Sequence, residues 1–141
     1  MLKILIPVDG SENSVRVIDF AIRLFGRSKE AEIRLITVRD PMDSLEVRRF
    51  TTAEQIETIQ QESGNEALEV ARARLDQAGV PYTAGILIGE IAETITKDAS
   101  DRHCDMIVMG TRGMGTIGSL LMGSVATKVV HLADVPVALV K

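Results

Sequence analysis

Short runs of apolar residues alternate along this 141-residue chain with segments that have the periodicity of helices. Continuous apolar runs rich in Ile and Val are typical of strands that are covered on both faces of a parallel sheet. The runs are Leu2–Val8, Ile33–Val38, Met106–Met109 and Val135–Val140, with a weaker one at Tyr82–Ile88. This alternation predicts an α/β fold, a single doubly wound five-stranded parallel sheet with helices on both faces.

Two of the intervening segments carry clear signals for where a helix begins and ends. In the first, Ser11 is the expected N-cap and Gly26 the expected stop. In the second, Thr51 and Glu54 have the spacing of a capping box, and Gly79 closes the pattern. Both segments are therefore predicted to be amphipathic helices.

A third helix is expected over roughly Glu90–Ser100, and a last one from Ser124, which we expect to be its N-cap. Residues 39–50, between the second strand and the long helix, show no periodicity. The apolar positions of the four helices recur at spacings of three and four, so we expect them to face the core. They are Val15, Ile18, Ile22 and Phe25; Ile56, Ile59, Leu68, Ala71, Leu75 and Ala78; Ile91 and Ile95; and Val125, Val129 and Leu132.

Composition narrows the class of protein. Hydrophobic residues make up 45% and charged residues 26% of a chain of one-domain length, so we expect one folded domain over residues 1–141. An aromatic content of 3% and a net charge of −4 argue against nucleic-acid binding, which needs stacking platforms or a basic face. The lone Cys104 and the short N-terminal apolar run predict a cytoplasmic protein with no membrane segment.

The strongest chemical signal is a glycine-rich segment between the fourth strand and the last helix, residues 110–124. Glycine lets a ligand approach backbone N–H groups, and the start of a helix favours phosphate oxygens. In open parallel sheets, ligands bind beyond the carboxyl ends of the strands, where Asp9 and Val38 are also expected. The segment therefore predicts a phosphate-binding site.

Two well-known phosphate motifs are matched only in part. Residues 113–118 read G-x-G-x-x-G, but they do not directly follow the strand that ends at Met109, and Asp134 comes too early for the acid of a dinucleotide site. Residues 118–124 resemble a P-loop, but Ser124 stands where that loop needs lysine. Neither motif is supported.

The spacing that fits completely is Gly110, two residues, Gly113, nine residues and then Gly123-Ser124. It resembles the ATP-binding loop of the universal stress protein family, G-x2-G-x9-G-(S/T). Other segments are similar to the family in the same order, namely KILIPVDGSENS, the Gly89 turn, DMIVMGTRG and VPVALVK. The resemblance covers essentially the whole chain and implies the same α/β fold.

The resemblance also implies a ligand and a mode of assembly. The ligand is ATP, alone or with Mg²⁺, and the family typically forms homodimers through the last strand, here Val135–Lys141. The implied binding residues are Asp9 and Val38 for the adenosine, Met109, Gly110 and Gly113 for the ribose and α-phosphate, and Gly123, Ser124 and Val125 for the outer phosphates, together with Pro7 and Val8.

Three functions remain open: a regulatory ATP binder in a stress response, a slow ATPase or autophosphorylating enzyme, and a ligand-free dimerisation module. Phosphoryl transfer needs cations and a group that orients the nucleophile. The glycine-rich segment has only Arg112, which is as compatible with solvent as with phosphate, and no lysine. Asp40, Asp43 and Glu46 fit either an Mg²⁺-linked wall or an exposed acidic loop. We therefore favour binding over turnover, and assign no catalytic residue, no metal ligand and no protein partner beyond a second copy.

Overall fold

The computed structural model describes residues 1–112 and 122–141. Its elements are β1 (Leu2–Pro7), α1 (Glu12–Phe25), β2 (Ala31–Arg39), α2 (Leu45–Phe50), α3 (Ala53–Gln77), β3 (Tyr82–Ile88), α4 (Ile91–Asp101), β4 (Met106–Gly110), α5 (Ser124–Leu132) and β5 (Val137–Val140). The strands pair in parallel in the order β3-β2-β1-β4-β5. The predicted five-stranded parallel sheet is confirmed.

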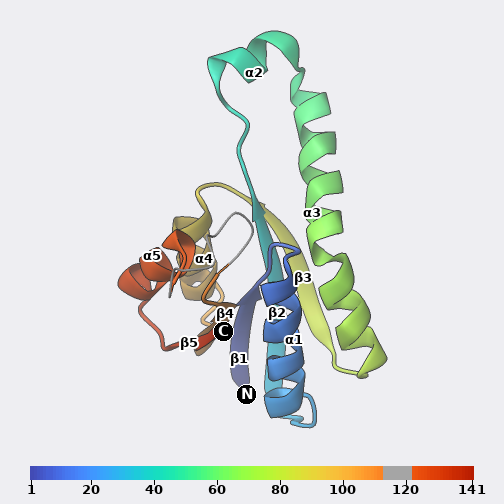
Figure 1. The fold of residues 1–141 in the computed structure, drawn as a ribbon, viewed down its shortest axis with the longest axis vertical. Helices are drawn as coiled ribbons and strands as arrows, with labels where there is room; N and C mark the ends of the chain where they lie inside the picture. The colour runs from blue at the N-terminus through green and yellow to red at the C-terminus, as the bar shows by residue number, and fades with distance from the viewer. Residues whose placement is uncertain (113–121) are drawn as a thin grey trace.

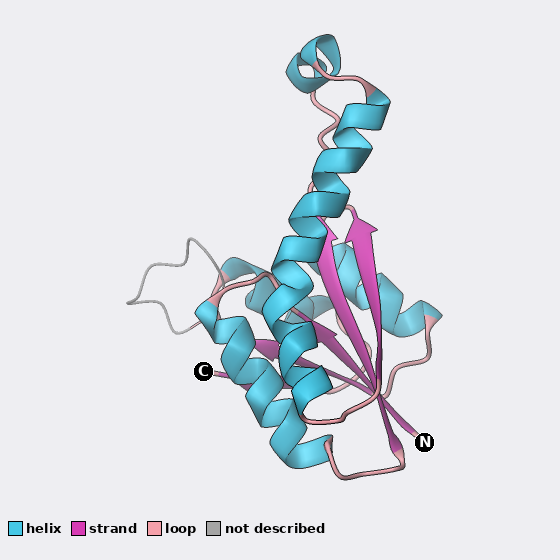
Figure 2. Ribbon diagram, turned by 90° about the vertical axis from the view of Figure 1, so that its right-hand side faces the viewer, coloured by secondary structure: helices cyan, strands magenta, loops and turns pink. Residues whose placement is uncertain are grey.

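Helices cover both faces of this sheet, with α1 and α3 on one face and α4 and α5 on the other (Figures 1 and 2). Successive side chains of a strand point to opposite faces, so a central strand needs apolar residues at every position. In β1, Ile4 and Ile6 pack under α1 and α3 while Leu5 packs under α4 and α5, all at 0% exposure. This double covering explains the continuous apolar runs.

The strand ends differ from the sequence prediction by one or two residues. β2 is longer, from Ala31 to Arg39, and β5 begins at Val137 instead of Val135. Pro136 has no N–H to donate to the ladder, although its carbonyl accepts from Ile107 N–H at 3.0 Å. The regular strand therefore starts after the proline.

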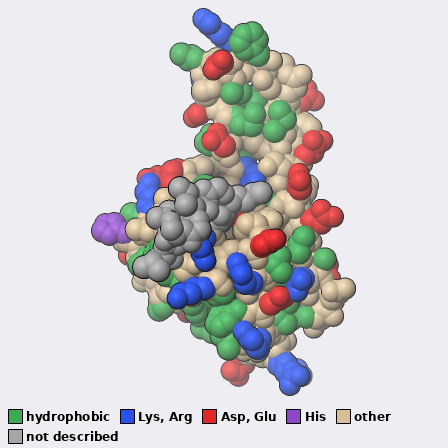
Figure 3. All heavy atoms as spheres, viewed as in Figure 1, with side chains coloured by type: hydrophobic (Ala, Val, Ile, Leu, Met, Phe, Trp, Pro, Cys, Tyr) green, Lys and Arg blue, Asp and Glu red, His purple; other side chains and the backbone are tan. Residues whose placement is uncertain are grey.

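A projecting arm, residues 40–63, extends past the ends of the strands (Figure 1). It contains α2, which the sequence analysis did not predict; Ser44 caps this helix by accepting from Val47 N–H at 3.2 Å. Leu45 and Phe50 are each 82% exposed, and Figure 3 shows hydrophobic side chains at the tip of the arm. A helix without a buried face has no apolar periodicity, which is why the segment looked irregular.

The long helix α3 departs from the prediction at both ends. Its capping box is formed by Thr52 and Gln55, one residue later than the predicted pair, because Thr51 is the extended C-cap of α2. Ile59 is 45% exposed since the first half of α3 belongs to the arm, and Ala78, at the C-cap, is exposed as well. The expectation that these two residues face the core was wrong.

Where α3 reaches the sheet, Gly64 allows a close approach. A Cβ at this position would lie 2.6 Å from the side chain of Ile86 on β3. The predicted core positions Leu68, Ala71 and Leu75 are buried beyond this crossing.

Two further positions expected in the core are partly exposed, Ile91 at 42% and Leu132 at 39%. Ile91 is the first residue of α4 and borders the pocket described below, while Leu132 is the last residue of α5. Among the described helices, none combines the length and apolarity needed to cross a membrane.

Candidate functional site

A pocket lies at the carboxyl edge of the sheet, where the chain switches from β1 on one side to β4 on the other. The strand order places this switch point between β1 and β4, and open α/β sheets bind ligands there. The ends of β1, β2 and β4 and the first turns of α1, α4 and α5 surround a space of about 800 Å³, its solvent-open part included.

Every predicted binding residue within the described ranges lines this pocket. These residues are Pro7, Val8, Asp9, Val38, Met109, Gly110, Gly123, Ser124 and Val125. Gly113 lies outside the described residues. The fold therefore brings together segments that are far apart in the sequence, as expected for strand ends in a parallel sheet, and contact with a nucleotide stays a prediction for each of them.

Asp9 is held in place by the start of α1. Its Oδ1 accepts hydrogen bonds at 2.9 Å from Ser11 N–H and from the Ser14 hydroxyl. Ser11 is the N-cap of α1, as predicted. The turn between them needs Gly10, which has φ +83° and passes close to Ala67 on α3. Asp9 is thus a fixed, half-buried carboxylate at the edge of the pocket.

One wall of the pocket is apolar. Val38 and Met109 are each 6% exposed, and Ile91 and Ile95 of α4 stand beside them. An apolar wall with few polar groups is the usual environment for a flat, weakly polar ring such as a nucleobase.

Another wall of the pocket is the N-terminus of α5. Gly123 is the N-cap of this helix and no side chain of the described residues caps it, which corrects the prediction that Ser124 has this role; Ser124 is the first helical residue. The first N–H groups of a helix have no partner within the helix, and together with the helix dipole they favour an anion. Ser124, Val125 and Ala126 supply these groups at the pocket.

The two ends of the glycine-rich segment are joined at its base. Thr111 N–H donates to the Val140 carbonyl at 3.0 Å, and Gly123 N–H donates to the Thr111 carbonyl at 2.5 Å. The Gly123 amide is therefore already used inside the protein. The Thr111 hydroxyl is buried and has no hydrogen-bond partner in the described part of the chain.

Two arginines border the pocket. The Arg39 guanidinium bonds to hydroxyl groups of Thr37 at 2.8 Å and Ser63 at 3.2 Å and to the Val38 carbonyl at 3.0 Å. Arg112 borders the pocket as well, while Lys128 on α5 pairs with Glu90 and Glu93 of α4. Among the described lining residues, the cations are thus arginines and none is a lysine.

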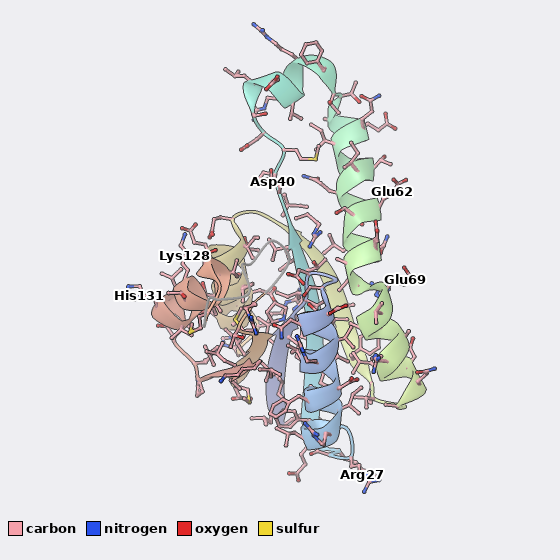
Figure 4. The ribbon with its side chains drawn as sticks, viewed as in Figure 1. Arg27, Asp40, Glu62, Glu69, Lys128 and His131 are labelled. Atoms are coloured by element: carbon pink, nitrogen blue, oxygen red, sulfur yellow. The ribbon has the colours of Figure 1, made fainter. Side chains whose placement is uncertain are left out.

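The acids expected in residues 40–46 lie on the projecting arm and do not line the pocket. Figure 4 places Asp40 at the base of the arm, and its Oδ1 accepts from Met42 N–H at 2.7 Å. Within residues 1–112 and 122–141, no three potential metal-ligating side chains gather in one place.

Sequence reasoning missed several lining residues, above all Asn13, Ser14 and Thr111. Their signal was available in part: Asn13 and Ser14 follow the N-cap of a helix that opens at a strand's carboxyl end, where side chains face the site. Thr111 lies within the glycine-rich segment itself.

The comparison with known proteins agrees with this architecture. The model of the universal stress protein family matches residues 1–141. Universal stress protein MJ0531 of Methanocaldococcus jannaschii is 34% identical over 139 residues, which cover 99% of this chain and 81% of that protein.

Solved structures show the same fold. The structure of MJ0577, also from M. jannaschii, has a TM-score of 0.82 and 29% identity and covers 99% of this chain and 94% of its own. A universal stress protein from Archaeoglobus fulgidus in complex with dAMP has a TM-score of 0.67 and 24% identity over 100% of this chain and 98% of its own. Other structures of this fold were solved with cAMP and AMP, at 23% and 21% identity. With the family model matched from end to end, this chain belongs to the universal stress protein family.

Proposed function

We propose that this protein binds an adenine nucleotide, ATP in the first place, and that it acts as a regulatory nucleotide binder in a stress response. The observation that carries the proposal is the pocket at the switch point, with an apolar wall at Val38 and Met109 and a second wall at the start of α5. An adenine ring suits the first wall and phosphates suit the second. Related proteins of this fold that hold AMP, cAMP or dAMP support the ligand class.

The residues present fit such a ligand. The Thr111 hydroxyl, which has no partner among the described residues, offers a hydrogen bond to a group that enters the pocket, since buried polar atoms are nearly always paired. The amides of Ser124 and Val125 would hold phosphate oxygens, and Asp9 would accept from a hydroxyl or amino group of the nucleoside. Mg²⁺, where it accompanies ATP, would be held mainly by the phosphates themselves.

Binding is tested by heating or denaturing the protein, purified without added nucleotide, and separating the supernatant by anion exchange. We expect adenine nucleotide in the supernatant, or a thermal shift on adding ATP. Affinity should rise from adenosine through AMP to ATP, because each added phosphate reaches further toward α5. A protein that neither carries nor responds to adenine nucleotide contradicts the proposal.

Turnover is the second candidate function, and the two arginines at the pocket are the observation in its favour. We infer that it is slow at most, because no described lining residue is a lysine that could stabilise the charge of the transferring phosphate. Phosphate release from ATP should stay far below about 1 per second, a rate at the low end for enzymes. A faster rate would make the protein an ATPase.

We also propose that the protein is cytoplasmic and forms homodimers through β5.

A further inference from the structure

Asn13 connects three parts of the pocket, although it lies outside the glycine-rich segment. It is in the first turn of α1 and is 6% exposed. Its Oδ1 accepts from Arg112 N–H at 3.3 Å, and its Nδ2 donates to the Val140 carbonyl at 3.5 Å. One buried side chain therefore links α1 to Arg112, the second residue after β4, and to the end of β5.

The same side chain occupies the space beside Gly110. A Cβ at residue 110 would lie 2.8 Å from Asn13 Cγ and closer still to Asn13 Oδ1. The φ of Gly110 is outside the left-handed region, so its backbone alone does not require glycine. Asn13 cannot move aside without losing its hydrogen bonds to Arg112 and Val140, so its side chain is the main obstacle to a Cβ here, and the Arg112 carbonyl oxygen, 3.1 Å from that Cβ, is the next.

The Val140 carbonyl is shared by two donors, Asn13 Nδ2 and Thr111 N–H. Because Gly123 N–H in turn donates to the Thr111 carbonyl, the start of the glycine-rich segment, the start of α5 and the end of β5 form one hydrogen-bonded junction. Asn13 is the member of this junction that reaches it from another helix.

We propose that Asn13 is a positioning residue for the phosphate side of the nucleotide pocket, and that Gly110 is glycine to admit the Asn13 side chain. The inference builds on the proposed nucleotide binding and names a determinant outside the G-x2-G-x9-G-(S/T) pattern. Asn13 acts through the backbone of residues 110–112, whose placement sets where Thr111 and α5 meet a ligand. None of the hydrogen bonds that form this junction involves Val38, on the adenosine side.

The packing part is tested without a ligand by a double-mutant cycle of N13A, G110A and N13A/G110A in urea. G110A should lower the midpoint of unfolding strongly, because its methyl group displaces Asn13. In N13A/G110A the methyl group enters the space that Asn13 leaves. The decrease in the urea midpoint of the double variant should therefore be much smaller than the sum of the decreases in the two single variants. Additive effects would overturn the assignment of Gly110.

A matched glycine serves as the control. Gly79 has φ +67°, and a Cβ there would meet no atom of the described residues within 4 Å, so G79A acts through backbone strain alone. G79A should therefore be additive with N13A. The comparison separates a specific contact from a general loss of stability.

The positioning part is read from two affinities measured on folded protein, for ATP and for adenosine. Loss of one well-placed hydrogen-bonding group lowers an affinity by about tenfold. N13A should therefore lower the affinity for ATP about tenfold and the affinity for adenosine less than twofold. N13A/G110A should bind ATP better than G110A does. An equal decrease in affinity for both ligands, or no decrease for either, would show that Asn13 has a role in folding only. Wild-type protein that binds no ATP refutes the proposed function and the positioning role together, whereas the urea cycle still decides the packing of Gly110.

Discussion

At the scale of single residues, a buried ion pair ties the sheet to α4. The Arg34 guanidinium of β2 meets the Asp98 carboxylate with Nε–Oδ2 at 2.7 Å and Nη2–Oδ1 at 3.1 Å, and the two side chains are 11% and 10% exposed. Gly85 of β3 leaves room for this arrangement, since a Cβ there would lie 3.2 Å from Nη2. The glycine that interrupts the third strand's apolar run therefore has a structural reason.

Breaking this pair from one side should be costly, because it leaves a charge without its partner in a buried place. We expect D98N to lower the free energy of unfolding by about 3 kcal/mol. D101N is the matched control on the same helix, since it removes the exposed Lys97–Asp101 pair and should have no measurable effect. Urea unfolding of both variants measures the difference, and equal effects would contradict the importance of burial.

At the scale of elements, two helices end in the same way with different residues. In α3 the chain turns at Gly79, with φ +67°, and Val80 N–H donates to the Leu75 carbonyl at 3.0 Å. In α4 it turns at His103, with φ +54°, and Cys104 N–H donates to the Ala99 carbonyl at 2.8 Å. Both are Schellman endings, in which glycine is the preferred residue at the left-handed position.

The two helix ends predict opposite effects of substitution. G79A should destabilise the protein by about 1 kcal/mol through left-handed strain. H103G should stabilise it by about 0.5–1 kcal/mol, the relief of strain being partly offset by the greater freedom of glycine in the unfolded chain. Thermal unfolding of the two variants is the measurement, and a destabilised H103G would show that the His103 ring contributes contacts of its own.

The beginning of α4 predicts a dependence on pH. Glu90 is the N-cap, and the hydrogen bond from Glu93 N–H is the main cause that lowers the pKa of its carboxyl, with Ala92 N–H and Lys128 adding to it. A carboxyl whose pKa is lowered by folding adds stability above its unfolded pKa, about 4.3, and loses it as the pH falls through the folded value. E90Q should therefore be less stable than wild type at pH 7 and equal to it at pH 2–3. Urea unfolding at the two pH values checks this, and a constant gap would assign the effect to something other than charge.

The elements with a buried face were predictable from the sequence, and those without one were not. β1 was found within a residue because its side chains lie between two layers of helices. The arm was missed since α2 buries none of its residues, and the prediction that Ile59 is buried failed because α3 leaves the sheet there. Apolar periodicity arises because one face of a helix is buried, so a helix that is exposed on all sides does not show it.

Some residues of the candidate site were likewise predictable from the sequence, and others were not. Strand ends and glycines are local signals, and they led to Asp9, Val38 and Gly123. Asn13 required the tertiary structure, because it meets Arg112 across 99 residues of sequence. The capping of α5 was also missed, since a serine after a glycine has the same local pattern whether it caps the helix or begins it.

At the scale of the whole molecule, β5 is an edge strand that pairs only with β4 in the described sheet. The carbonyls of Pro136 and Val140 accept from Ile107 and Thr111, so the backbone groups of these alternate residues point toward β4. Those of Val137 and Leu139 consequently point outward. An exposed edge of this kind is a template for pairing with another chain.

The proposed homodimer uses this edge, so removing one outward N–H should weaken it. We expect L139P to shift the protein from dimer to monomer in sedimentation, because proline at this position removes no bond to β4. L139A is the matched control: it truncates the side chain, which packs on the α4 and α5 side of the core, but keeps the N–H. A charged residue at 137 or 139 would be a poorer test, since both side chains contribute to that core. If L139A dissociates as fully as L139P, or if wild type is already a monomer, backbone pairing through β5 does not form the dimer.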